Sequence, residues 1–328
     1  MMKRNVQHVR FNELVPCRTA FVDTYNPGTE GKENFTIIGG GVSENSDQHI
    51  HIQETPGFNI GGAGQPAGCI NSLHSHRTAE VFIIHTGSWR FFWGLKGDDG
   101  DVVLDPGDLI SLPTHMFRGF ENVTPISTTN ENGYGFMFSV LGGDDSGGGV
   151  VWAPEVLEQA RSNGLILIES GQLINTRNGE TIPDGLLPVV PVAGDELSFY
   201  SRNTITDESK VVAPRPNDTI YCETELIGRN SNAVIGERPG FEVRRVQWGR
   251  GEDIPWYVPN MDVVLISNTG SVVLSNGKTL GSGDVAFIQA GEEKIDVKPL
   301  SEDVSELFIV IATDDPAGET RSLREDAP

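Results

Sequence analysis

Three residues with the chemistry of metal ligands stand close together in the sequence. His74 and His76 are separated by one residue, and Glu80 follows four positions after His76. Because side chains alternate along a strand with a period of two residues, all three would point to the same side of an extended segment. Two imidazoles and a carboxylate that converge on one point leave further metal positions open for substrate or oxygen. The segment therefore predicts a candidate metalloenzyme site.

Glycines frame this segment at regular intervals, and a second block follows twenty positions later. The residues of the frame and of the second block are Gly68, Gly87, Gly107, Pro113, His115, Arg118 and Asn122. The pattern resembles the two motifs of the cupin superfamily. The first motif, G-x5-HxH-x3-E-x6-G, is matched at every element over 68–87. The second motif, G-x5-PxG-x2-H-x3-N, is matched at Gly107, Pro113 and Asn122. His115 stands at its second glycine, and Arg118 stands at its histidine.

The second half of the chain repeats this spacing without the ligands. The spacing of the first block recurs at Gly251 and Gly270, and that of the second block recurs at Gly283 and Gly291. At the ligand positions the repeat carries Tyr257, Pro259, Val263 and Lys294. All seven histidines lie in the first half of the chain, His115 being the last of them. Only the first repeat is therefore expected to bind a metal, and the chain resembles a bicupin.

The resemblance implies an all-β chain of two tandem cupin barrels, each a jelly roll (double-stranded β-helix). The composition agrees, because 39 glycines, 19 prolines and many short apolar runs predict strands joined by turns. One short helix is expected over 154–163, where a proline opens the segment and Gly164 ends it. We expect the following parts: a first barrel over 1–150, a linker with the short helix over 151–195, a second barrel over 196–314 and a flexible tail over 315–328.

The resemblance assigns metal ligation to His74, His76 and Glu80. His115 lies just before the strand that delivers the last ligand in this family, so it is a candidate for the fourth ligand or for a group at the rim. The metal expected from the resemblance is Fe(II), with Mn, Ni, Cu and Zn as alternatives, and it would occupy the first barrel alone.

Arg118 is the informative departure from the family pattern, because a guanidinium stays protonated and does not bind metals. It would either form an ion pair with Glu80, in a site that has lost its metal, or anchor an anionic group of the substrate by a bidentate hydrogen bond. Lys294 stands at the equivalent position of the repeat, so a cation at this place is also expected to be structural in both barrels.

The remaining histidines and aromatic residues predict structural roles. His49 and His51 have no glutamate at ligand spacing and are typical of an amphipathic strand. His85 comes just before the turn at Gly87 and is expected to be exposed. The alternating aromatic residues of 89–93 are expected in the core, although an aromatic barrel mouth would also suit an aromatic substrate.

Composition excludes several classes of partner. With 24 basic and 46 acidic residues the chain carries a net charge of −22, which disfavours nucleic acid and anionic membranes. Three widely spaced cysteines without a CxxC pattern indicate neither a disulfide framework nor a zinc site. The first residues do not form a signal peptide, and no stretch approaches a membrane span, so we expect a cytoplasmic location.

These observations favour a non-haem dioxygenase that acts on a small organic substrate, anionic and either aromatic or enolised. One alternative is an isomerase or hydrolase that uses its metal only as a Lewis acid. Another is a bicupin without catalytic activity that binds or stores small molecules. The second barrel is expected to supply structure and the contacts of a homodimer.

Overall fold

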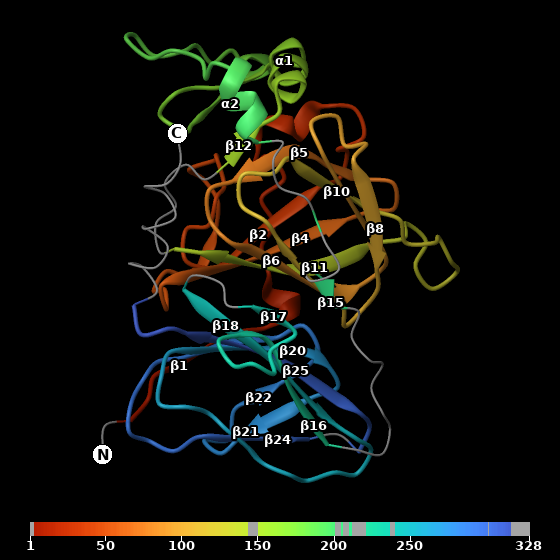
Figure 1. Cartoon of the computed structure of the whole chain (residues 1–328), viewed down its shortest axis with the longest axis vertical. Helices are drawn as coiled ribbons and strands as arrows, with labels where there is room; N and C mark the ends of the chain where they lie inside the picture. Colours follow the sequence, from red (N-terminus) through yellow and green to blue (C-terminus); the bar gives the residue numbers. More distant parts are fainter. Residues whose placement is uncertain are drawn as a thin grey trace.

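Strands form almost all of the regular structure of the chain. The computed structural model describes residues 3–143, 150–200, 205, 210–211, 221–236, 240–300 and 302–315. The strands of this part build two barrels that lie one above the other in Figure 1, with the N-terminal half uppermost. The prediction of an all-β chain with two tandem barrels is confirmed.

The first barrel consists of two sheets. The smaller sheet contains, in order, β12 (Val150–Trp152), β5 (Ile70–His76), β10 (Arg118–Asn122), β7 (Trp89–Trp93) and β8 (Gly100–Leu104). The larger sheet contains β15 (Lys210–Val211), β9 (Leu109–Leu112), β6 (Glu80–Thr86), β11 (Gly135–Gly142), β4 (Phe58–Gln65), β2 (Glu33–Ile38) and β3 (Ile50–Ile52). The aromatic residues of β7 alternate into the barrel core, as predicted.

The second barrel has the same plan. Its larger sheet contains β1 (Val6–Val9), β23 (Val285–Ile288), β20 (Val263–Thr269), β25 (Ser305–Ala312), β18 (Phe241–Trp248), β16 (Cys222–Gly228) and β17 (Ile235–Gly236). Its smaller sheet contains β19 (Trp256–Tyr257), β24 (Asp296–Pro299), β21 (Val272–Leu274) and β22 (Thr279–Leu280). Strand β1 crosses to the second barrel and pairs with β23, while β15 pairs with β9 of the first. Each barrel thus has one sheet edge covered by a strand from the other half, which protects that edge from further pairing.

The internal repeat is visible in the strand boundaries. When Gly251 is aligned with Gly68, strands β18 and β20 begin and end at the positions of β4 and β6. When Gly283 is aligned with Gly107, β23 begins and ends at the positions of β9. The repeat in the sequence therefore corresponds to a repeat in the fold.

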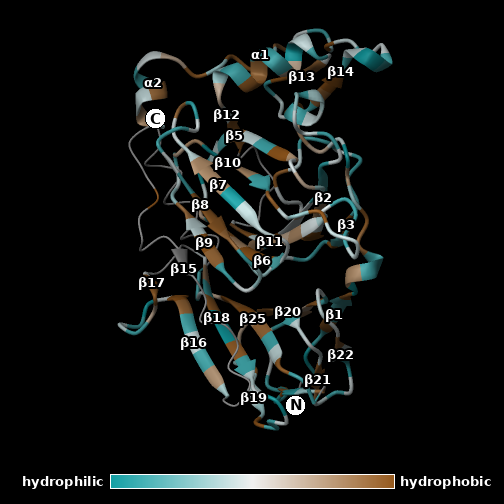
Figure 2. Ribbon diagram, turned by 90° about the vertical axis from the view of Figure 1, so that its right-hand side faces the viewer, coloured by the Kyte–Doolittle hydropathy of each residue, from teal (hydrophilic) through white to brown (hydrophobic). Residues whose placement is uncertain are grey.

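The two large sheets pack against each other through equivalent faces. Val81 and Ile83 of β6 belong to the same apolar cluster as Val264 and Ile266, which occupy the same positions of β20. Figure 2 shows hydrophobic segments along strands of both barrels. Phe138 of β11 is fully buried in the same cluster. Because this cluster is continuous, the barrels share one core at their interface.

Polar residues also lie in this interface. His85 is only 7% exposed, and its Nδ1 lies 3.0 Å from Oδ1 of Asn268, the residue at the same position of the repeat. Asn268 in turn donates to Glu306 at 2.7 Å. The expectation that His85 is exposed is therefore wrong, because the second barrel covers the end of β6.

Helical segments lie over one end of the first barrel (Figure 1). The predicted helix is confirmed as α1 (Pro154–Ser162), and a short hairpin of β13 (Leu165–Leu167) and β14 (Leu173–Asn175) follows it. A second helix, α2 (Gly194–Phe199), was not predicted. The remaining helical turns are η1 (Phe11–Glu13), η2 (Val22–Tyr25) and η3 (Thr176–Asn178). Of the expected tail, residues 316–328 lie outside the described residues.

Candidate metal centre

The structure brings together the three residues that the sequence singled out. Strand β5 carries His74 and His76 on its inner face, and the next strand, β6, begins with Glu80. One potential ligand atom from each residue lies within 4.8 Å of those of the other two. All three side chains are buried. The alternation along β5 and the short turn after it therefore create a compact set of nitrogen and oxygen donors.

The hydrogen bonds of His74 leave one ring nitrogen available. Its Nδ1 lies 2.7 Å from the carbonyl oxygen of Ser72 and 3.3 Å from Nδ2 of Asn71. The shorter contact decides the tautomer, so Nδ1 carries the proton and donates to Ser72, and Nε2 keeps its lone pair. Burial, with smaller contributions from Arg118 and His76, holds the pKa of His74 well below its usual value. His74 is therefore neutral at neutral pH, as a metal ligand must be.

Glu80 is ionised although it is buried. Arg118 donates to its Oε2 at 2.7 Å, and Nε2 of His76 lies 3.4 Å from its Oε1. Burial alone would raise the pKa of this carboxyl. His76 and Arg118 together lower the pKa by a larger amount, so the net pKa lies well below the usual range. The site thus offers an anionic oxygen beside the two imidazoles.

Arg118 is fully buried at the start of β10, directly opposite His74 of β5. Besides Glu80, its guanidinium donates to the carbonyl oxygens of Met116 at 3.2 Å and of His74 at 3.4 Å. The predicted ion pair with Glu80 is therefore present. Arg118 is not among the described residues that line the adjacent cavity. Its role as an anchor for substrate stays a prediction. Lys294 is exposed, so the expectation of an equivalent structural cation in the second barrel is wrong.

His115 occupies the position at which the motif has glycine, and its backbone adopts the left-handed conformation that glycine favours, with φ 56°. Its N–H donates to the carbonyl oxygen of His76 at 2.9 Å. Its ring, however, packs against Phe199 and Tyr200, with centroid distances of 4.8 and 6.1 Å. Within the described part of the chain, His115 does not belong to the compact ligand group. Its assignment as a fourth ligand stays a prediction.

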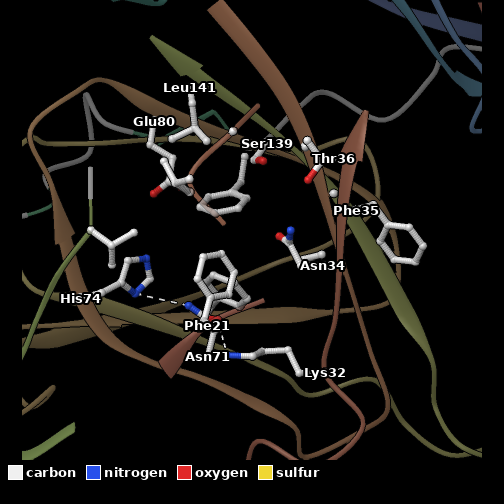
Figure 3. Close-up of a pocket in the computed structure, with 18 of the residues that line it drawn as sticks. Phe21, Lys32, Asn34, Phe35, Thr36, Asn71, His74, Glu80, Ser139 and Leu141 are labelled. Carbon is white, nitrogen blue, oxygen red and sulfur yellow. Dashed lines mark hydrogen bonds between the residues drawn. The ribbon is translucent and has the colours of Figure 1, made fainter. Parts of the chain in front are cut away.

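The three residues face a cavity of about 60 Å³ inside the first barrel. The aromatic residues of its wall are Phe21, Phe35, Phe82, Phe120 and Trp152, and the polar ones include Lys32, Gln65, Asn71 and Ser139. Figure 3 shows His74 and Glu80 on one side of this space, with Asn71 and Lys32 below and Asn34 and Thr36 opposite. The volume corresponds to roughly four to six water positions, so the cavity suits a small ligand.

A buried polar chain leads from Lys32 to the edge of the His74 ring. Lys32 forms an ion pair with Asp23 and donates to Oδ1 of Asn71 at 3.1 Å, which directs Nδ2 of Asn71 toward His74 (Figure 3). Asp23 also accepts from the backbone N–H of Ser72 at 3.1 Å. Sequence reasoning missed Lys32 and Asn71, and apart from the nearness of Asn71 to His74 no local pattern marked them.

Another buried carboxyl, that of Glu44, lies behind Trp152. The indole N–H of Trp152 donates to Glu44 at 2.6 Å, and its ring lies 5.5 Å from that of His74. The backbone N–H of Val22 donates to the other oxygen of Glu44 at 2.7 Å. Burial raises the pKa of Glu44 to about 8, against the opposing effect of these two hydrogen bonds. No pattern in the sequence indicated this group.

The interior of the second barrel is filled with apolar side chains instead. They include Trp248, Val263, Leu265 and Leu307, which belong to one buried cluster. Tyr257, which stands at the position of His74, is 67% exposed. The repeat therefore preserves the barrel but replaces the ligand set by packing.

Comparisons with known proteins establish the fold. No protein-family model and no curated protein matches the sequence. The pirin YhhW of Escherichia coli, solved in complex with nickel(II), has 10% identity and a TM-score of 0.53 over 94% of this chain and 99% of that protein. A variant of oxalate decarboxylase from Bacillus subtilis has 12% identity and a TM-score of 0.54 over 96% of this chain and 78% of that one. The chain therefore has the bicupin fold. No helix among the described residues has the length and hydrophobicity needed to cross a membrane.

Proposed function

We propose that this protein is a metal-dependent bicupin that binds one divalent metal ion through His74, His76 and Glu80. The donor set supports the proposal, since neutral imidazoles and a carboxylate suit first-row transition metals. The hydrogen bonds to Ser72 and Arg118 are partners of the kind that orient ligating histidines and carboxylates. The single observation that carries the proposal is that two histidines and one ionised glutamate converge on the same buried cavity.

The balance of charge around the cavity supports an anionic substrate. The charged side chains on or beside its wall already form oppositely charged pairs: Lys32 with Asp23, Glu80 with Arg118, and Glu33 with Arg18. Ligating histidines are neutral, so a divalent cation would add a positive charge that these pairs, the ones found among the described residues of the wall, do not offset. A bound carboxylate or enolate would compensate for this charge, because an unpaired charge in a buried site is costly.

The reaction that we propose is an oxygenation of dioxygenase type on a small anionic or enolised substrate. The metal, when bound, would supply open coordination positions and one-electron chemistry, with Fe(II) proposed first and Mn, Ni or Cu next; Zn, which has no redox chemistry, would supply the coordination positions alone. The residues of the chain would exclude water through the aromatic wall, hold His74 through Ser72 and keep Glu80 ionised through Arg118. The size of the cavity favours a compact acid over a fused aromatic ring system.

Two observations also support alternatives. The ligand set serves equally for an isomerase or hydrolase that needs only a Lewis acid. The ion pair of Arg118 with Glu80 neutralises the carboxylate without a metal, which is what a metal-free binding protein would need. We further propose a homodimer and a cytoplasmic location.

The experiment that separates these functions starts from protein purified without chelators. Metal content is measured by mass spectrometry, and oxygen uptake is recorded with small 2-oxo and 2-hydroxy acids, diketones and phenols. Bound iron with substrate-dependent oxygen uptake supports the dioxygenase. Bound zinc without oxygen uptake, but with isomerised or hydrolysed product, supports the Lewis-acid enzyme. Protein that contains no metal and rebinds none supports the binding protein and contradicts the metal-dependent proposal.

A further inference from the structure

The cavity contains a buried polar side chain that no group in the described part of the chain satisfies. Gln65, the last residue of β4, is fully buried and lines the cavity beside the three ligand residues. Neither its Nε2 nor its Oε1 has a hydrogen-bond partner among the described residues. Buried polar groups are almost always paired, so two orphaned atoms on one amide, inside a cavity, indicate a missing ligand.

The backbone of Gln65 is held at the edge of the cavity by hydrogen bonds on both sides. Its carbonyl oxygen accepts from the side chain of Asn122 at 2.6 Å, and the residue pairs with Gly135 of β11. The residues that precede it on the same face of β4, Gly61 and Ala63, are small and also line the cavity. This strand therefore contributes small residues to the cavity wall and a carboxamide at its end.

The second barrel shows that the fold does not require a glutamine here. Trp248 stands at the position of Gln65 in the repeat, as the last residue of the equivalent strand β18. Its indole is fully buried in the apolar core and donates to the carbonyl oxygen of Ile254 at 2.7 Å. The same position thus holds a satisfied, space-filling side chain in the barrel without ligands, and an unsatisfied one in the barrel with them.

We propose that Gln65 is the positioning and specificity residue of the cavity, and that it recognises a small 2-hydroxycarboxylate or the enol of a 2-oxo acid. A carboxamide offers one acceptor and two donor hydrogens on one plane. The hydroxyl of such an acid donates to Oε1, and the neighbouring carboxylate oxygen accepts from Nε2. Lactate and glycolate are of the size that a cavity of about 60 Å³ admits. This inference rests on the proposed function for the metal and the anionic charge, but the carboxamide contact itself does not.

Matched ligand pairs test the contact. The affinities of glycolate against acetate, and of lactate against propionate, are measured by calorimetry on metal-loaded protein, and metal content is determined on the same samples. Wild-type protein is expected to prefer the hydroxy acid by about 2- to 13-fold in at least one pair, which corresponds to the one net hydrogen bond that the hydroxyl adds, because both members of a pair carry the carboxylate. Gln65→Met keeps the length of the side chain but removes both polar atoms, and should bind the two members of each pair equally. Gln172→Met, an exposed change of the same type on the linker hairpin, should behave as wild type.

The outcomes are distinguishable. A hydroxy-acid preference that survives in Gln65→Met, or that is lacking in the wild type, overturns the inference. If the wild type binds no metal, the proposed function fails, and the same ligand pairs measured by NMR on the metal-free protein still decide the role of Gln65. Thermal unfolding without ligand gives a second readout. Gln65→Met should unfold at a higher temperature than wild type, because it removes unsatisfied buried groups, whereas a lower temperature would indicate a structural role and contradict the inference.

Discussion

Replacing Arg118 by methionine tests whether this residue belongs to the metal centre or only stabilises the fold. Methionine keeps most of the length and the apolar stem but removes the charge and the donors. In the metal-free protein the change leaves Glu80 as a buried carboxylate without its 2.7 Å partner. In the metal-loaded protein the cation would compensate for the same carboxylate. The loss of stability should therefore depend on whether the metal is present.

The expected magnitude follows from the burial of both partners. Arg118 is fully buried and Glu80 is 3% exposed, and removal of one partner of a buried ion pair typically costs about 3–5 kcal/mol. Metal binding should recover most of this loss. The carbonyl oxygens of Met116 and His74 also lose a donor, which adds about 1–3 kcal/mol for each that does not gain water, and metal binding should not restore this part.

The dependence of stability on pH tests whether the deficit of Arg118→Met comes from the ionised Glu80. In the wild type the pKa of Glu80 is depressed, so its contribution to stability is present above the unfolded pKa, about 4.3, and is lost as the pH falls through the lower folded pKa. Without Arg118 the effect of burial is opposed less, and the pKa of Glu80 rises. The deficit of Arg118→Met should accordingly be largest at neutral and alkaline pH and should shrink as acid protonates Glu80.

The assay is urea unfolding of wild-type and variant protein, each with and without saturating metal. Arg245→Met is the matched control, because Arg245 is 1% exposed and lies 3.9 Å from Glu306, away from the cavity. The control should lose stability to a similar extent, and metal should not restore it. The reasoning is refuted if Arg118→Met is as stable as wild type without metal, or if metal restores both variants equally.

Two further predictions concern the surroundings of the site. Glu44 should make the protein less stable as the pH rises from about 4.5 to 8, because folded Glu44 retains a proton that unfolded Glu44 releases. In urea unfolding, Glu44→Gln should flatten this dependence of stability on pH. An unchanged dependence would contradict the assignment of a raised pKa to Glu44. Asn71→Ala should change metal affinity by less than about 3-fold in a chelator competition, because Nδ2 of Asn71 and the protonated Nδ1 of His74 are both donors and the carbonyl oxygen of Ser72 orients the ring; a loss of roughly 10- to 100-fold would contradict this tautomer.

The parts of the site that depend on local spacing were predictable from the sequence. His74 and His76 share a face because side chains alternate along one strand, as predicted. The expectation that Glu80 continues the same extended segment is wrong, because the chain turns after His76 and Glu80 begins the next strand. The repeat of the glycine spacing likewise corresponds to strand boundaries, since insertions fall in turns and not within paired strands.

The parts that depend on contacts between distant segments were not predictable. Lys32 and Asn71, or Glu44 and Trp152, are far apart in the sequence and meet only in the folded chain. His85 looked like a residue near an exposed turn, and it is buried because the other barrel covers it. No local periodicity carries such information, because these groups become neighbours only when the barrels close and pack.

The orphaned amide of Gln65 belongs to the same class. Its sequence neighbourhood is rich in glycine and other small residues and matches no motif. Its interest arises from three features of the folded chain: complete burial, the lack of a partner among the described residues, and the tryptophan at the equivalent position of the second barrel. Comparison of the two barrels supplied a reference that the sequence motifs could not provide.

The metal content of the protein tests the central claim most directly. Wild-type protein purified without chelators, or reloaded after their removal, is expected to retain about one equivalent of a divalent transition metal per chain. His76→Ala should retain almost none while remaining folded, and Tyr257→Ala, at a ligand-equivalent position of the second barrel, should retain the full amount. A wild-type protein that neither contains nor rebinds metal would contradict the account, as would a His76→Ala variant with full occupancy.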